Sequence, residues 1–427
     1  MLRGVICFCF AELASLLFAQ SPATISLAQA RQLAVQNHPR VASAALLAQA
    51  SKSVVREMRS AYYPSLSSNT SAVGTPEHNS VLSAGAVTTS SIFDRVASGI
   101  VASQLLTDFG RTKNLESSAR LRSESQDQEV VETRSQVLAE VSETYFNALA
   151  AEAVLKVAQA TLDLRRVTLR QVTALSQSAL RSTLDVSFAQ VNVSQAELDL
   201  VRAQDQAKAN HARLSAAMGN DSDQPFSLSD EPLPAELNPN VDALIDQGMQ
   251  ERPDLAAVKL NQQSLERTAE AEKDLRNPTI SASAVAGVAP IKDDRLPETY
   301  GAAGLTVSIP ILNGGLFKAR HEEAEARAAA AAKDVQTLSV QIARDVRVAW
   351  LDANDAFRRL DVTSRMVAEA TEAVRLAQAR YDAALGSIVE LTQAQLNQTS
   401  AEIAAATAKY EYLDRRAVLD YAMGVLR

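Results

Sequence analysis

The chain has 427 residues and a formal net charge of −8, with no block rich in lysine or arginine. Hydrophobic residues make up 47% of the sequence but aromatic residues only 4%, and alanine supplies much of the apolar total. This composition favours long packed helices over a compact aromatic core. The acidic balance and the lack of a basic run exclude nucleic acid as a predicted partner.

The amino terminus has the pattern of a secretory signal. Arg3 precedes a mostly apolar run that ends at Ala19, as in segments that are cleaved during export. We expect residues 1–19 to be removed. Both cysteines, Cys7 and Cys9, lie in this segment, so the mature chain is expected to lack disulfides and an acyl anchor. An uncleaved membrane anchor is the alternative, which the shortness of the run disfavours.

The first repeat of the chain is predicted to be residues 20–219. Two helices, at about 26–37 and 39–63, are bounded by prolines, and a strand pair around a loop follows at about 64–109. A long helix then begins near Thr112, where a stretch without proline or glycine opens. Apolar residues recur every seven positions along it, which is typical of a coiled-coil seam: Val141, Ala148, Leu155, Leu162 and Leu169.

The same order is written a second time in residues 241–427. Gly110 matches Gly315 and Gly219 matches Gly424, each pair being 205 residues apart, which is the signature of an internal repeat. The second repeat is predicted to contain helices at about 241–250 and 253–277, a strand pair at about 279–312 and another long helical hairpin. Residues 220–240 are rich in proline, aspartate, serine and asparagine and are predicted to connect the repeats.

The spacing changes upstream of the long helices. Pro39 matches Pro253 and Pro64 matches Pro278, both 214 residues apart. The two repeats therefore differ in length by nine residues, and the difference lies between Pro64 and Gly110. Such length differences usually fall in exposed loops.

The strands of the second repeat alternate in a way that favours a membrane. Small polar residues occupy one face, and apolar residues the other: Ile280, Ala282, Ala284, Ala286 and Val288, then Ala303, Leu305, Val307, Ile309 and Ile311. Strands of about ten residues with this pattern are typical of a barrel with a wet lumen. Four strands cannot close a barrel alone, because their edges would leave amides unsatisfied in lipid, so several copies must share it. A soluble hairpin packed on helices is the alternative.

A group of residues is predicted to turn each strand into the long helix. Proline cannot donate to a strand ladder, glycine permits backbone angles closed to other residues, and asparagine can cap the new helix. These junction residues are Asp108, Gly110, Pro310, Asn313, Gly314 and Gly315.

Over nearly the whole mature chain, the sequence resembles the TolC-like outer membrane efflux family. The resemblance rests on the duplicated strand–loop–strand–helix plan, "VSIPILNGG", "RPDL" at 252–255, "NPTISASA" at 277–284 and the paired "AMG" endings. It implies a mainly α fold with a small β portion, in which duplicated coiled-coil hairpins form a periplasmic tunnel. The four strands would contribute to a shared trimeric transmembrane β-barrel.

The resemblance also implies function and partners. The chain would be a homotrimeric exit duct of a tripartite efflux or type I secretion system, set in outer-membrane lipid and extending into the periplasm. Its partners would be a periplasmic adaptor (membrane fusion) protein and an inner-membrane transporter. No cofactor and no metal are expected.

The family closes its periplasmic end near the tips of the helical hairpins. Carried over by position, the candidate gate residues are Arg181, Asp185, Tyr381, Gly386 and Glu390. The chain has Gln395 where a second acid is expected nearby. Solvated charges on a helix surface are the alternative interpretation of these residues.

Three other classes of protein fit the sequence less well. The four histidines are scattered, and the sequence has no phosphate loop and no nucleophile elbow, so an enzyme is not expected. A passive porin would need many more strands per chain. A secreted or periplasmic coiled-coil scaffold without a barrel is the alternative that explains the helices, although it does not require the alternating strands.

Overall fold

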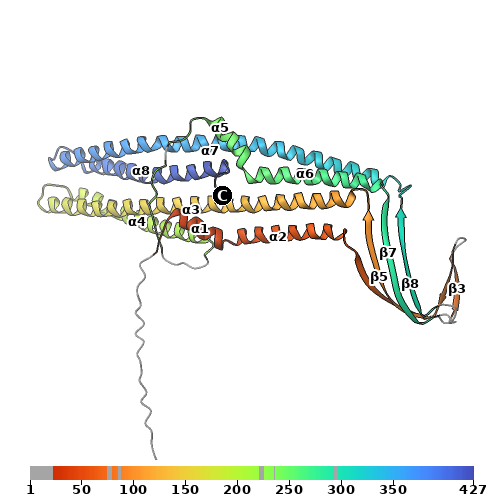
Figure 1. Ribbon diagram of the computed structural model, residues 1–427. Helices are drawn as coiled ribbons and strands as arrows, with labels where there is room; N and C mark the ends of the chain where they lie inside the picture. Colours follow the sequence, from red (N-terminus) through yellow and green to blue (C-terminus); the bar gives the residue numbers. More distant parts are fainter. Residues whose placement is uncertain (1–22, 75–78, 85–87, 221–225, 235, 293–296) are drawn as a thin grey trace, which may run out of the picture. The chain divides into compact units, whose positions relative to one another are not determined.

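The computed structural model describes residues 23–74, 79–84, 88–220, 226–234, 236–292 and 297–427 (Figure 1). The predicted signal segment, residues 1–19, lies outside the described residues, as do parts of the connector. None of the described helices combines the length and the apolar composition needed to cross a membrane.

The chain folds into two compact units, and each unit takes segments from both repeats. Unit 1 comprises Met1–Ala34, Val141–Ala235 and Thr363–Glu411. Unit 2 comprises Val35–Glu140, Glu236–Val362 and Tyr412–Arg427.

The long helices of the two repeats match in length. The first repeat has α1 (Leu27–Asn37), α2 (Pro39–Ser60), α3 (Arg111–Gln177) and α4 (Thr183–Ala217). The second has α5 (Val241–Glu251), α6 (Pro253–Lys273), the 3₁₀ turn η1 (Asp274–Arg276), α7 (Leu316–Asp382) and α8 (Ile388–Ala422). Both α3 and α7 have 67 residues, and both α4 and α8 have 35. Each pair of helices begins and ends 205 residues apart, the spacing found in the sequence.

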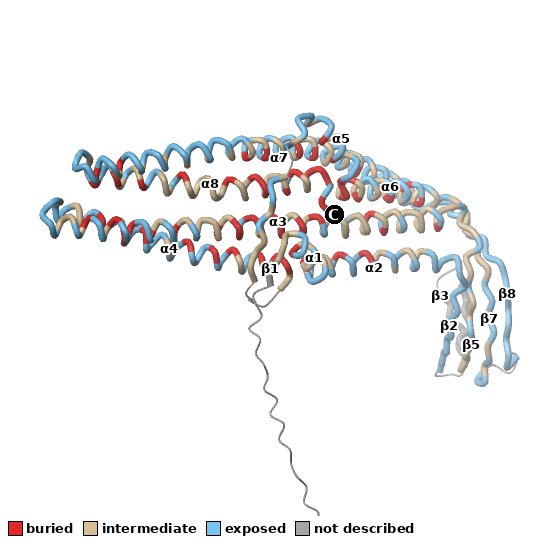
Figure 2. Tube along the Cα trace, turned by 60° about the vertical axis from the view of Figure 1, so that its left-hand side comes forward, coloured by how far each residue is buried: buried red, intermediate tan, exposed pale blue. Residues whose placement is uncertain are grey.

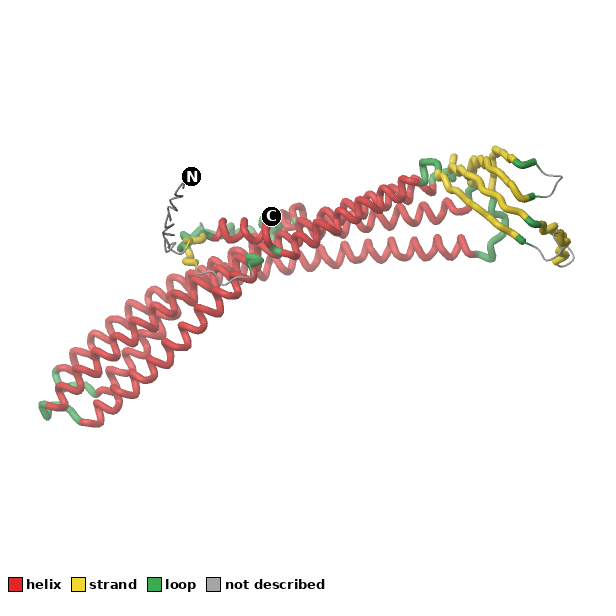
Figure 3. Tube along the Cα trace, turned by 90° about the horizontal axis from the view of Figure 1, so that it is seen from below, coloured by secondary structure: helices red, strands yellow, loops and turns green. Residues whose placement is uncertain are grey.

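Four strands form one antiparallel sheet in unit 2 (Figures 1 and 3). They are β2 (Ser65–Val73), β5 (Arg95–Thr107), β7 (Thr279–Ile291) and β8 (Thr299–Ser308), in the order β2-β5-β7-β8. The sheet therefore joins the two repeats through the β5–β7 ladder, and it leaves one edge of β2 and one edge of β8 unpaired within the described chain.

The register carries the predicted alternation through β7 and β8, and less cleanly through β2 and β5. Leu66 lies opposite Ala102, which lies opposite Ala284, which lies opposite Ala303. This face is mostly apolar and includes Ile100, Ile280, Ala282, Ala286, Val288, Leu305 and Val307. The other face carries most of the small polar residues, together with Val101, Leu105 and Val285: Ser65, Ser67, Asn69, Ser71, Ser103, Thr279, Ser281, Ser283, Thr306 and Ser308.

Some strand boundaries differ from the sequence prediction. Strand β8 ends at Ser308, so Ile309 and Ile311 lie beyond it, because Pro310 has no N–H to continue the ladder. The loop between the first strand pair contains a hairpin of β3 (Asn79–Ala84) and β4 (Thr88–Phe93).

The connector also contains a short strand that was not predicted. Within it, β6 (Phe226–Leu228) pairs in parallel with β1 (Ala23–Ile25). A strand of three residues is too short to show an alternating pattern, which is why the sequence did not reveal this pair.

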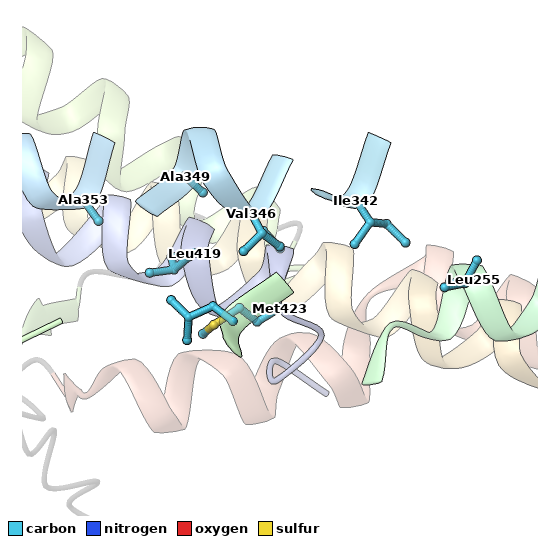
Figure 4. Close-up of a cluster of buried hydrophobic side chains, with 9 residues drawn as sticks. Leu255, Ile342, Val346, Ala349, Ala353, Leu419 and Met423 are labelled. Atoms are coloured by element: carbon cyan, nitrogen blue, oxygen red, sulfur yellow. The ribbon is translucent and has the colours of Figure 1, made fainter. Parts of the chain in front are cut away.

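A buried cluster in unit 2 joins α5, α6, α7 and α8 (Figure 4). Ile342 and Val346 of α7 are fully buried, and Leu419 of α8 and Leu255 of α6 pack in the same cluster. Along α7, buried positions recur on one side of the helix while its other side stays exposed (Figure 2). The helix thus packs through a narrow apolar stripe.

The "RPDL" motif forms the corner between α5 and α6. The Arg252 guanidinium donates to both carboxylate oxygens of Asp254, at 3.0 and 2.6 Å. Pro253 occupies the first turn of α6, where its missing N–H costs nothing. Gly424, just past α8, has φ +73°, and a Cβ there would lie 2.8–3.0 Å from backbone atoms of Glu251 and Arg252.

We therefore predict that Gly424→Ala destabilises the protein more than Gly314→Ala does. Both glycines have positive φ, but a Cβ at Gly314 would meet nothing within 4 Å. The Gly314 variant should lose about 1–2 kcal/mol of stability from backbone conformation alone, and the Gly424 variant at least about 1 kcal/mol more from the clash. Thermal unfolding followed by circular dichroism measures both losses of stability. Equal losses would show that the α5–α6 corner can move away from the added methyl group without an energetic cost.

Candidate functional site

The first strand-to-helix junction is held by the carboxylate of Asp108. Its Oδ2 accepts the N–H of Thr112 at 2.7 Å and the Thr112 hydroxyl at 2.6 Å, while Oδ1 accepts the N–H of Gly110 at 3.3 Å. Asp108 thus satisfies free donors in the first turn of α3. Gly110 has φ +121°, and a Cβ there would lie 3.1 Å from Asp274.

The second strand-to-helix junction is held by backbone hydrogen bonds instead of a side-chain carboxylate. Gly314 and Gly315 both have positive φ, +62° and +86°. The carbonyl of Asn313 accepts the N–H of Leu316 at 3.2 Å, and the carbonyl of Gly315 accepts that of Ala319 at 3.0 Å. The two glycines allow the chain to change direction between Pro310 and α7.

The hairpin turns at the helical tips have the same backbone in both repeats. Each long helix ends with an alanine in the left-handed region: Ala179 with φ +57° and Ala384 with φ +63°. In each turn the next residue, Leu180 or Leu385, donates its N–H to a carbonyl five residues back. This is the helix C-cap in which glycine is usually found.

Tyr381 brings the two tips of unit 1 together. Its hydroxyl donates to Oδ2 of Asp185 on α4 at 3.2 Å. The Arg181 guanidinium lies 4.1 Å from the centre of the Tyr381 ring and donates to the Tyr381 carbonyl. Three of the sequence-predicted residues, from both repeats, therefore form one cluster.

Tyr381 is also part of the apolar core beneath the tips. Its side chain is only 2% exposed and packs with Val172, Ala189 and Leu391. Burial, followed by the charge of Asp185, raises the pKa of Tyr381 to about 12. The phenol is therefore neutral at physiological pH and remains a hydrogen-bond donor to the Asp185 carboxylate.

Glu390 and Gly386 belong to a separate contact within the second hairpin. The Arg380 guanidinium donates to Oε1 of Glu390 at 2.9 Å and to the carbonyl of Leu385 at 3.2 Å. A Cβ on Gly386 would lie 3.2 Å from both Arg380 Cβ and Glu390 Oε2. Sequence reasoning did not identify Arg380, because its pairing with Glu390 depends on how the turn folds.

A buried arginine below the tips was also missed. Arg165 of α3 is 4% exposed and Gln395 of α8 is 3% exposed, and the guanidinium donates to the Gln395 amide oxygen. Burial lowers the pKa of Arg165, and among the described residues no carboxylate lies within ion-pair distance of it. Among the residues that the structure describes, no cluster of His, Cys, Asp and Glu side chains is suited to a metal ion.

A small sheet whose strands run into paired helical hairpins is also the fold of a solved outer-membrane channel. The model of the family described as outer membrane efflux protein matches residues 30–220 and 244–425, and the chain belongs to this family. Membership confirms the predicted fold class, the predicted location in the outer membrane and the prediction of a transport protein rather than an enzyme.

Individual relatives are distant. The chain is 22% identical to the outer membrane protein TolC of Vibrio cholerae, over 94% of this chain and 91% of that protein. It is also 22% identical to TolC of Escherichia coli, over 66% of this chain but only 60% of that protein. The solved outer-membrane channel OprN has a TM-score of 0.81 at 18% identity, covering 93% of this chain and 89% of that one. The outer membrane protein VceC from Vibrio cholerae has a TM-score of 0.79 at 19% identity, covering 93% and 96%.

We predict that Ala384→Gly and Ala179→Gly each stabilise the protein. Glycine removes the cost of a Cβ in the left-handed region, so each variant should gain about 1 kcal/mol. The matched control is Ala383→Gly, at the end of the same helix but without positive φ, which should lose up to about 1 kcal/mol. Chemical denaturation distinguishes them, and a destabilised Ala384→Gly variant would contradict the argument.

Proposed function

We propose that this chain is the homotrimeric exit duct of a tripartite efflux or secretion system and that it conducts substrates passively. The observation that carries the proposal is the open four-stranded sheet continued by long helices. A membrane strand needs about 9–11 residues, and the four strands have 9, 13, 13 and 10.

The free edges of the sheet support a shared barrel. Within one chain β2 and β8 each have one unpaired edge, and in hydrocarbon every unpaired amide costs several kcal/mol. Pairing β8 of one copy with β2 of the next removes both edges. Three copies, the number implied by the resemblance, give a twelve-stranded barrel with the serine- and threonine-rich face toward the lumen.

The tips supply a device for opening and closing. Arg181 and Asp185 on the first hairpin both contact Tyr381 on the second, so this cluster links the two hairpins of unit 1 at their tips. Because Tyr381 is also buried in the core, opening requires its helix to move with it. A periplasmic adaptor that binds the separated hairpins better would shift the population toward the open duct, and an inner-membrane transporter would supply the energy.

The assembly is tested by negative-stain electron microscopy of protein extracted from outer membranes in detergent. We expect three-fold particles with a detergent-bound head and a tail of about 100 Å, the length of a 67-residue helix at about 1.5 Å per residue. Thin soluble rods, or protein missing from the outer membrane, would instead support a periplasmic scaffold.

The gate is tested by conductance in planar bilayers. Tyr381→Phe keeps the ring in the core but removes the hydrogen bond to Asp185, worth about 2 kcal/mol for a charged acceptor. The open fraction should rise by up to roughly thirtyfold. Replacing both acids, with Asp185→Asn and Glu390→Gln, should weaken any preference for cations.

A matched control lies at the connector. The Tyr410 hydroxyl donates to Asp230 at 3.2 Å, the same distance as in the Tyr381 pair, and burial together with Asp230 raises the pKa of Tyr410 to about 12. Tyr410→Phe should leave conductance unchanged. If Tyr381→Phe and the double acid variant also conduct like the parent, the tips are not the gate.

A further inference from the structure

Tyr300 lies across two glycines on the sheet of unit 2. In the ladders Tyr300 of β8 is opposite Gly287 of β7, which is opposite Gly99 of β5. A Cβ on Gly99 would lie 2.3 Å from the Tyr300 hydroxyl, and a Cβ on Gly287 would lie 2.4 Å from it. The phenol therefore fills the space of two absent side chains, an arrangement known to compensate for glycine in sheets.

The ring lies on the polar face of the sheet. Tyr300, Gly99 and Gly287 are each an even number of residues from polar-face positions on their own strands, namely Thr306, Ser103 and Ser283. An aromatic residue near the end of a membrane strand usually belongs to the lipid-facing belt. The position of Tyr300 over the glycine backbones places it on the opposite face, which is the lumenal face in the proposed barrel.

The ring remains partly accessible. Tyr300 is 38% exposed, although its hydroxyl and Cζ lie over the backbone of Gly99 and Gly287. The strand end that carries Tyr300 is the one joined to the β7–β8 loop, whereas α7 follows the opposite end of β8. Tyr300 therefore lies at the end of the sheet farther from α7.

We propose that Tyr300 sets the width of the outer mouth of the duct and that Gly99 and Gly287 keep the mouth wide by letting the ring lie flat. This inference rests on the proposed function. A methyl group at position 99 would displace the hydroxyl, and since the sheet is behind the ring, the displaced ring would project further into the lumen. In a trimer three rings would narrow the mouth at one level.

The test is thiol labelling of intact cells, with Thr306→Cys as the reporter. Thr306 is exposed on the polar face, six residues from Tyr300 toward α7, and the two native cysteines lie in the predicted signal segment. A membrane-impermeant polymer maleimide and a small methanethiosulfonate are added outside. With Gly99→Ala, polymer labelling should slow by roughly fivefold while labelling by the small reagent changes little, since pore diameter selects by size.

Two further variants identify the cause. In Gly99→Ala with Tyr300→Phe the polymer rate should recover, because the hydroxyl is the atom at 2.3 Å and the next ring atom lies at 3.2 Å. Gly301→Ala is the matched control: its Cβ would point to the other face, with Val285 O nearest at 3.7 Å, and should label like the parent.

The outcomes separate this inference from the proposed function. A parental polymer rate in Gly99→Ala would overturn the role of Tyr300 while leaving the duct intact. If the Thr306→Cys reporter is not labelled even by the small reagent, the proposed channel fails, and the inference with it. If Gly99→Ala does not reach the membrane, Tyr300→Phe should restore assembly, and no restoration would overturn the inference.

Discussion

The unpaired edges of a four-stranded sheet constrain the rest of this molecule. In hydrocarbon the edge amides of β2 and β8 have no water to bond with, so the sheet requires further copies of itself. Strands β5 and β8 lead directly into α3 and α7. Any assembly that pairs the edges therefore brings the long helices of several copies together, and such an assembly offers cover to exposed apolar residues such as Val340, 71% exposed on α7.

Much of the helical fold could be predicted because it is written twice. The 205-residue spacing that relates Gly110 to Gly315 also relates both ends of the long helices in the structure. The β1–β6 pair and the β3–β4 hairpin were missed, because short strands without alternation leave no periodic signal. The end of β8 was also not predicted. The apolar alternation continues to Ile311, but Pro310 prevents pairing, so the strand ends before it.

The candidate site was predictable as a set of positions but not as a set of contacts. The resemblance named Asp185 and Tyr381, which the fold brings to 3.2 Å. It also named Glu390, whose partner Arg380 depends on a turn conformation that the sequence does not display. At the hairpin turns the repeat holds in the backbone and not in the side chains: the residue that corresponds to Tyr381 in the first repeat is Ser176, and the residue that corresponds to Arg181 in the second is Gly386. The similar turns of the two hairpins are therefore compatible with a Tyr381–Arg181–Asp185 cluster that the repeat does not duplicate.

The equal lengths of the two helical hairpins limit how this chain can vary. Adding one residue inside α3 would rotate every later side chain by about 100°, one step of a helix with 3.6 residues per turn, and move the seam away from its partner. Insertions in the helices would have to come in heptads and in both repeats at once. The nine-residue difference between the repeats lies instead between Pro64 and Gly110, in the region of the β3–β4 hairpin. New length can accumulate there without disturbing the helices.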